Sequence, residues 1–179
     1  MSHVRTPATI EEVPEASRPV LETIAKRLGC VSSVFRVLSN SPAALASYTE
    51  LQGALGRGKL PPATRERIAL AMAEVNGCDY CLAAHTYFGR TFARLDDAEI
   101  AAARGGSSTD AKAAAALAFV KALAEKRGSV TPVEVEAVQA AAYSDAEVVE
   151  IVALNTLTNY LNRALDTAVD FPVVDRLAA

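Results

Sequence analysis

Two of the three cysteines, Cys78 and Cys81, stand three residues apart, and one of the two histidines, His85, follows four residues later. Positions spaced by three and four share one face of a helix, so these side chains are expected to lie together. The thiolate is the reactive form of cysteine, and it needs a group that lowers the pKa of the thiol. An imidazole one turn away can take the proton and return it. The spacing predicts a cysteine pair with its own base.

Two carboxylates are candidates for orienting the His85 imidazole. Glu66 lies one helix back and reaches His85 if the two helices pack antiparallel. Glu74 is closer in sequence, but it lies one turn from the predicted helix end and can point to solvent. Helix geometry favours Glu66 and leaves Glu74 as the competitor.

The pair Asn76-Gly77 suits the left-handed end of one helix, so the next helix should begin at Cys78 or Asp79. Free amide protons and the helix dipole then favour negative charge on a sulfur in the first turn. Two thiols at this spacing can also close a disulfide, which in a reducing compartment is typically transient and catalytic. In outline, Cys81 attacks a peroxide oxygen, Cys78 condenses with the resulting sulfenic acid, and an external dithiol resets the pair.

Other interpretations of these residues stay open. Cys-x-x-Cys-x-x-x-His can ligate zinc, but a closed site needs a fourth ligand, and we expect no bound metal or cofactor. Cys30 is expected to be an ordinary buried thiol. Tyr80, between the two cysteines of the pair, is either a wall of the pocket or a hydroxyl relay.

Composition restricts the class of protein. The 179 residues suffice for one domain, 1–179, and a core with 51% apolar residues and no Trp favours close helix packing. With a net charge of −3, the chain lacks the excess of basic residues that is typical of nucleic-acid-binding proteins. The longest apolar run is far below the ~18 residues of a membrane span, and the first residues lack the apolar stretch of a signal peptide. We therefore expect a cytoplasmic protein without nucleic-acid or membrane partners.

Helical periodicity and capping signals recur along the chain, and alternating strand patterns are nearly absent, so the predicted fold class is all-α. Residues 1–13 lack a period and are expected to form a flexible or interface arm. The predicted helices run over Glu15–Leu28, Ser33–Leu38, Pro42 to Gly56, Pro61 to Asn76, Cys78 or Asp79 to Phe92, Asp96 to Gly105, Ser108 or Thr109 to just before Gly128, Thr131 to Ala142, and Ser144 to Asp166.

A row of polar residues, Asn155, Asn159, Asn162 and Asp166, follows one face of the last predicted helix. It is either a hydrogen-bonding stripe or the lining of a subunit interface or of the site, with Asn159 as the candidate site residue. Ala-rich helical faces and the aromatic residues Tyr87 and Phe88 after His85 favour a homo-oligomer.

The segment from Glu66 through Cys78-x-x-Cys81-x-x-x-His85 resembles the AhpD-like alkylhydroperoxidases of the carboxymuconolactone decarboxylase superfamily, and more narrowly their peroxidase-related subgroup. The resemblance covers Leu60 to about Gly89, with looser support from Ser144 to Asp166. It implies a helical bundle whose core hairpin carries the motif, and assembly into trimers or hexamers. It also implies a cycle in which hydroperoxide is the substrate and a lipoyl-type or other dithiol protein is the reductant.

By the same resemblance, Cys81 is the peroxidatic thiol, Cys78 resolves, and His85 with Glu66 forms the proton relay. One departure concerns Tyr80, which stands where the best-known members have a second relay histidine, because a phenol with a pKa near 10 accepts protons poorly at neutral pH. Lactone decarboxylation is disfavoured, since the decarboxylase branches lack the cysteine pair.

The main hypothesis is a peroxidase that reduces organic hydroperoxides or hydrogen peroxide. A redox-responsive regulatory protein, in which the Cys78–Cys81 disulfide changes assembly without turnover, is the alternative from another class. A protein disulfide reductase shares the chemistry and differs in the electron acceptor.

Overall fold

The computed structural model describes residues 2–158 and 161–174, and for residues 156–158 the backbone alone. The described residues contain no β-strand, and the all-α prediction is confirmed. The elements in chain order are the 3-10 turns η1 (Ile10–Glu12) and η2 (Glu15–Ser17) and the helices α1 (Arg18–Leu28), α2 (Ser33–Leu38), α3 (Pro42–Gly56), α4 (Pro62–Val75), α5 (Asp79–Thr91), α6 (Asp97–Arg104), α7 (Ala111–Glu125), α8 (Pro132–Ala140), α9 (Asp145–Thr158) and α10 (Leu161–Leu165).

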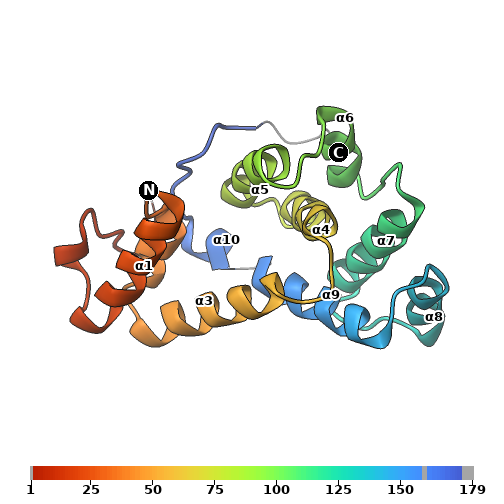
Figure 1. Cartoon of the computed structure of the whole chain (residues 1–179), viewed down its shortest axis with the longest axis horizontal. Coiled ribbons are helices and arrows are strands. Elements are labelled where there is room, and N and C mark those ends of the chain that lie inside the picture. The colour runs from red at the N-terminus through yellow and green to blue at the C-terminus, as the bar shows by residue number, and fades with distance from the viewer. Residues whose placement is uncertain (1, 159–160, 175–179) are drawn as a thin grey trace.

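Helix α4 lies near the middle of the molecule and packs against α5, α6, α7 and α9 (Figure 1). Its residues 68–73 are all buried, with Ile68, Leu70 and Met72 fully enclosed. A helix that is apolar on every side is typical of a core element, and the alternating alanines let neighbouring helices approach closely. The helix that carries Glu66 is therefore held firmly from several directions.

A tight turn joins α4 to α5 and forms the predicted hairpin. Gly77 has a φ of 59°, a left-handed conformation that a glycine adopts without strain. The Cys78 amide donates to the Ala73 carbonyl at 2.9 Å, which closes the end of α4. Cys78 is then the N-cap of α5, so both cysteines lie at the start of that helix as expected.

The N-terminal residues contact α10, which packs beside α5. The predicted helix from Ser144 to Asp166 corresponds to α9 and α10, and residues 159–160 between them lie outside the described residues; α10 packs against α5. The predicted N-terminal arm contacts its own chain here: the His3 amide donates to the Leu165 carbonyl at 2.8 Å, and the Ser2 hydroxyl donates to the same oxygen at 2.7 Å.

Two local predictions are wrong. Helix α7 is capped by Asp110 rather than by Ser108 or Thr109, whose hydroxyls instead donate to the carboxylate of Glu99. Cys30 is exposed in the turn after α1 instead of packed in the core.

In the described part of the chain, every helix is too short or too polar to traverse a lipid bilayer.

Candidate active site

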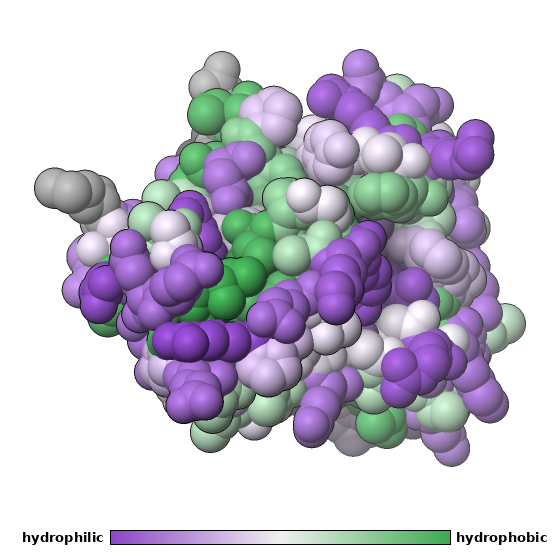
Figure 2. Space-filling model, turned by 60° about the vertical axis from the view of Figure 1, so that its left-hand side comes forward, coloured by the Kyte–Doolittle hydropathy of each residue, from purple (hydrophilic) through white to green (hydrophobic). Residues whose placement is uncertain are grey.

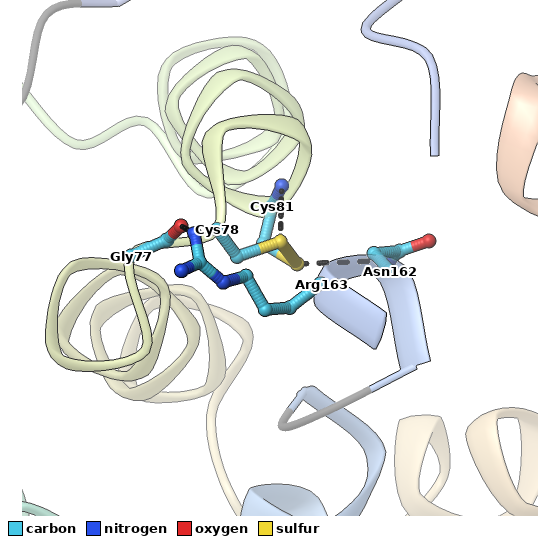
Figure 3. Close-up of a disulfide and its surroundings, with 5 residues drawn as sticks. All are labelled: Gly77, Cys78, Cys81, Asn162 and Arg163. Carbon is cyan, nitrogen blue, oxygen red and sulfur yellow. Dashed lines mark hydrogen bonds between the residues drawn. A yellow bond between two sulfur atoms is a disulfide. The ribbon is translucent and has the colours of Figure 1, made fainter. Parts of the chain in front are cut away.

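Cys78 and Cys81 form a disulfide at the start of α5, with their Cα atoms 5.3 Å apart (Figure 3). The two residues are only 3% and 4% exposed. The Cys81 amide donates to the Cys78 sulfur at 3.2 Å, as a backbone donor does to an N-cap side chain. The pair can thus store and release two electrons in a site that is largely screened from solvent.

The structure places Glu66 of α4 against His85 of α5. The distance from Glu66 Oε2 to His85 Nδ1 is 2.9 Å, and both side chains are 22% exposed. A carboxylate at Nδ1 sets the ring orientation and leaves Nε2 to exchange protons with a reacting group. Of the two carboxylates considered from the sequence, Glu66 has the geometry of an orienting group.

The competitor, Glu74, lies elsewhere. Its carboxylate is paired with Arg104 of α6 at 2.9 Å in a partly buried contact. Glu74 therefore joins two helices near the end of α4 and is not brought to His85. The other predicted lining residue, Asn159, lies outside the described residues.

A cavity of about 220 Å³ brings the reactive groups together. Cys81, His85 and Glu66 all line it. Cys78 lines a different and more polar cavity of about 380 Å³, together with Arg163. Of the two sulfurs, Cys81 is thus the one that shares a space with the imidazole.

A larger cavity of about 460 Å³ adjoins the first one, and both are lined by Tyr48, Glu66 and His85. Its walls are mainly apolar and aromatic, including Val34, Phe35, Phe88 and Phe92. Figure 2, in which the α1 side comes forward, shows hydrophobic side chains gathered in a hollow that hydrophilic side chains surround. Such a cavity suits a small organic molecule with an apolar body.

Tyr80 is a wall of this cavity, and its hydroxyl lies near Ser32 and Val34 at the start of α2. Burial raises the pKa of Tyr80, and burial likewise raises the pKa of Tyr48 to about 12. Both phenols keep their protons at neutral pH. The geometry favours the wall over the hydroxyl relay for Tyr80.

Asn162 of α10 is a site residue that the sequence reasoning did not select. Its amide nitrogen donates to the Cys81 sulfur at 3.6 Å, while its amide oxygen is buried without a hydrogen-bond partner among the described residues. The polar row on the last helix was the available signal. The packing of α10 against α5 brings Asn162 to the sulfur, and this packing could not be anticipated from spacing.

Arg163, the next residue, donates to the Gly77 carbonyl at 2.8 Å and holds α10 on the turn between α4 and α5 (Figure 3).

In the described part of the chain, no three His, Cys, Asp or Glu side chains come close enough to hold a metal ion.

Residues 42–125 match the model of the carboxymuconolactone decarboxylase family. No curated protein matches the chain. One similar solved structure is the alkylhydroperoxidase AhpD core, an uncharacterized peroxidase-related protein, from Ralstonia eutropha JMP134, with a TM-score of 0.82 and 21% identity over 94% of this chain and 92% of that one. Another is an uncharacterized peroxidase-related protein from Silicibacter sp. TM1040, with a TM-score of 0.80 and 19% identity over 93% and 91% of the two chains.

A third similar structure is the debrominase Bmp8 in complex with 2,3,4-tribromopyrrole, with a TM-score of 0.77 and 20% identity over 95% and 94% of the two chains. At these identities, the likenesses establish a shared fold.

Proposed function

We propose that the chain is an AhpD-like member of the carboxymuconolactone decarboxylase superfamily and a thiol-dependent peroxidase that acts on organic hydroperoxides. The observation that carries the proposal is the cavity that Cys81 shares with the Glu66–His85 pair. A nucleophilic thiol, a base and a group that orients the base are the parts that such chemistry requires.

The oxidative half of the cycle begins on the reduced protein, where His85 takes the Cys81 thiol proton. The thiolate attacks the terminal oxygen of the hydroperoxide, the O–O bond breaks, and the departing alkoxide takes the proton from the His85 imidazolium. The products are Cys81 sulfenic acid and an alcohol. Cys78 then gives its proton to His85 and attacks the Cys81 sulfur, and hydroxide leaves as water after reprotonation.

The reductive half of the cycle needs an external dithiol, which we propose to be of the lipoyl type or carried by a protein. One thiolate of the dithiol attacks the disulfide, and its second thiol then displaces the remaining sulfur. Two electrons return to Cys78 and Cys81, and the reductant leaves as a disulfide. Access is narrow, since the two cysteines are 3% and 4% exposed.

The apolar cavity of about 460 Å³ favours organic hydroperoxides over hydrogen peroxide. An apolar body placed against Phe35 and Phe88 would direct the peroxide group to the smaller cavity with Cys81. Hydrogen peroxide has no apolar body, so contacts with these walls do not increase its binding affinity.

The proposal is tested by following hydroperoxide consumption with dihydrolipoamide as the reductant. We expect sustained turnover with cumene hydroperoxide, and loss of turnover in Cys81→Ser because serine is not redox-active. Stoichiometric oxidation without recycling would instead support the regulatory alternative. Unchanged turnover in Cys81→Ser would refute the assignment of the attacking thiol.

Reductive debromination is a second candidate, favoured by the likeness in fold to the debrominase Bmp8 and by the apolar cavity beside the cysteine pair. In that reaction the dithiol would become a disulfide while a carbon–bromine bond becomes a carbon–hydrogen bond and bromide is released. Bromide release from a brominated pyrrole, without hydroperoxide consumption, would select this function.

A further inference from the structure

The contact between Asn162 and Cys81 has a chemical consequence for the proposed peroxidase cycle. Asn162 lines both the small cavity of Cys81 and the larger apolar cavity next to it. Its Nδ2 atom lies 3.6 Å from the Cys81 sulfur. Figure 3 shows the amide nitrogen directed at the disulfide and the amide oxygen pointing away from it.

The amide oxygen of Asn162 is the second observation. It is buried and accepts no hydrogen bond from any described residue. A buried acceptor without a partner carries a desolvation cost, which a bound molecule with an O–H group can relieve. A hydroperoxide has such a group on the oxygen that the thiolate attacks.

We propose that Asn162 is a further catalytic residue that holds both reacting atoms, and this rests on the proposed peroxidase function. Its Nδ2–H group stabilises the Cys81 thiolate, and its Oδ1 atom accepts the hydrogen bond of the terminal peroxide O–H. That proton stays on the oxygen that is transferred to sulfur, so it ends on the sulfenic acid. His85, on the other side of the reaction, protonates the departing alkoxide.

The two roles can be separated by substitution. Asn162→Asp removes the donor and adds a negative charge beside the sulfur, but keeps an acceptor oxygen. Asn162→Leu removes both the donor and the acceptor at similar size. Gln52→Glu is the matched control, because Gln52 lines the same two cavities and undergoes the same change of amide to carboxylate without a contact to sulfur.

The titration of Cys81 is measured in full-length reduced protein with Cys30→Ala and Cys78→Ser, which leaves one thiol. Serine preserves the N-cap of α5. The charged and titratable groups that line the cavities of Cys81 and Cys78 in the described part of the chain are the same in the Asn162 variants. The cavity of Cys81 has His85, Glu66, Arg65 and Tyr48, and the cavity of Cys78 has His3, Asp79, Tyr80, Arg163 and Asp166. A difference in Cys81 titration between the parent and an Asn162 variant then reports on Asn162.

The pH dependence of alkylation by iodoacetamide gives the pKa of Cys81. We expect Asn162→Asp to raise it by about one unit, so that alkylation at neutral pH slows about tenfold, while Gln52→Glu shifts it much less. A shift in Asn162→Asp no larger than in Gln52→Glu would overturn the donor role. The alkylation experiment needs no peroxide, so it tests whether Asn162 donates to Cys81 even if the protein does not reduce hydroperoxides.

The acceptor role is tested by single-turnover reaction with cumene hydroperoxide at a pH where Cys81 is fully ionised. There we expect Asn162→Leu to react about tenfold more slowly than the parent, and Asn162→Asp to lose less because it keeps the acceptor. Equal limiting rates in the parent and Asn162→Leu would overturn the acceptor role. No reaction in the parent itself would instead refute the peroxidase function.

Discussion

Glu66 is the residue on which the proposed proton relay depends, because its carboxylate lies 2.9 Å from Nδ1 of His85. In Glu66→Gln the carboxylate that contacts His85 Nδ1 and orients the imidazole is lost. We expect the single-turnover rate with hydroperoxide to fall by about 10- to 100-fold, within the range of general acid–base contributions.

Glu74→Gln is the matched control for that substitution. Glu74 is paired with Arg104, so the same chemical change there should lower the free energy of unfolding and leave the peroxide rate close to that of the wild type. Equal losses of rate in the two variants would remove Glu66 from the relay.

The choice of Glu66 over Glu74 could be made from the sequence, because a short turn forces two helices to pack side by side. The sequence indicated Asn162 only as one member of the polar row on the last predicted helix, because the contact of this residue with Cys81 depends on how α10 packs against α5. The exposure of Cys30 was also beyond prediction, since a lone cysteine in a turn carries no periodic signal.

The connection between α3 and α4 is fixed by Glu150 of α9. The backbone amides of Lys59 and Leu60 donate to Glu150 Oε2 at 2.8 and 3.1 Å, ahead of the helix that carries Glu66. A Cβ atom at Gly58 would lie 2.6 Å from Glu150 Oε2. The loop can therefore bind this carboxylate only with a glycine at that position, because a larger residue would force the carboxylate to withdraw.

In Gly58→Ala the Glu150 carboxylate must withdraw and leave two amides without their acceptor. We expect the free energy of unfolding in urea to fall by about 1–3 kcal/mol. Gly56→Ala is the control, because its Cβ would meet nothing within 4 Å. A similar small change in both variants would show that Glu150 does not hold the connection.

Element boundaries could be predicted closely where a cap, a proline or a glycine marks them, as at Pro42, Pro62 and Gly77. Helix α7 begins later than predicted, because Ser108 and Thr109 donate hydrogen bonds to the buried carboxylate of Glu99 on α6 and do not cap α7. Hydrogen bonds between different helices cannot be recognised from the local sequence.

That carboxylate, Glu99, also determines how the whole molecule responds to acid. Burial would raise the pKa of Glu99, but hydrogen bonds from Ser108, Thr109 and Arg67 outweigh burial and lower the pKa from 4.5 to about 2. A carboxylate whose pKa is lower in the folded state stabilises the fold above the unfolded-state value and loses this contribution as the pH falls toward the folded-state value.

We therefore expect Glu99→Gln to unfold more easily than the wild type at neutral pH, by on the order of 3 kcal/mol. The difference should shrink as the pH is lowered from about 4.5 toward about 2, as measured by denaturant titration at each pH. A difference that does not change with pH would mean that Glu99 is not the group responsible.

Assembly is a prediction about the whole molecule that rests on its exposed aromatic residues. Tyr87 and Phe92 are 41% and 66% exposed and their rings contact each other, which favours burial against another copy. We expect a trimer or hexamer by light scattering, and a smaller species for Phe92→Ser.

Val133→Ser is the control for assembly, since Val133 on α8 is 70% exposed but has no aromatic neighbours among the ring contacts of the described residues. A monomeric wild type, or equal effects of the two substitutions, would contradict the predicted interface. The fold class of the molecule was predictable from its periodicity, whereas the contact between the N-terminal residues and α10 was not.

The central claim is that Cys81 attacks the hydroperoxide and Cys78 resolves the product. The most direct measurement is mass spectrometry of full-length protein carrying Cys30→Ala, treated with one equivalent of cumene hydroperoxide and dimedone, which traps sulfenic acids. We predict a dimedone adduct on Cys81 in the Cys78→Ser variant and none on Cys78 in the Cys81→Ser variant. An adduct on Cys78, with Cys81 unmodified, would contradict it.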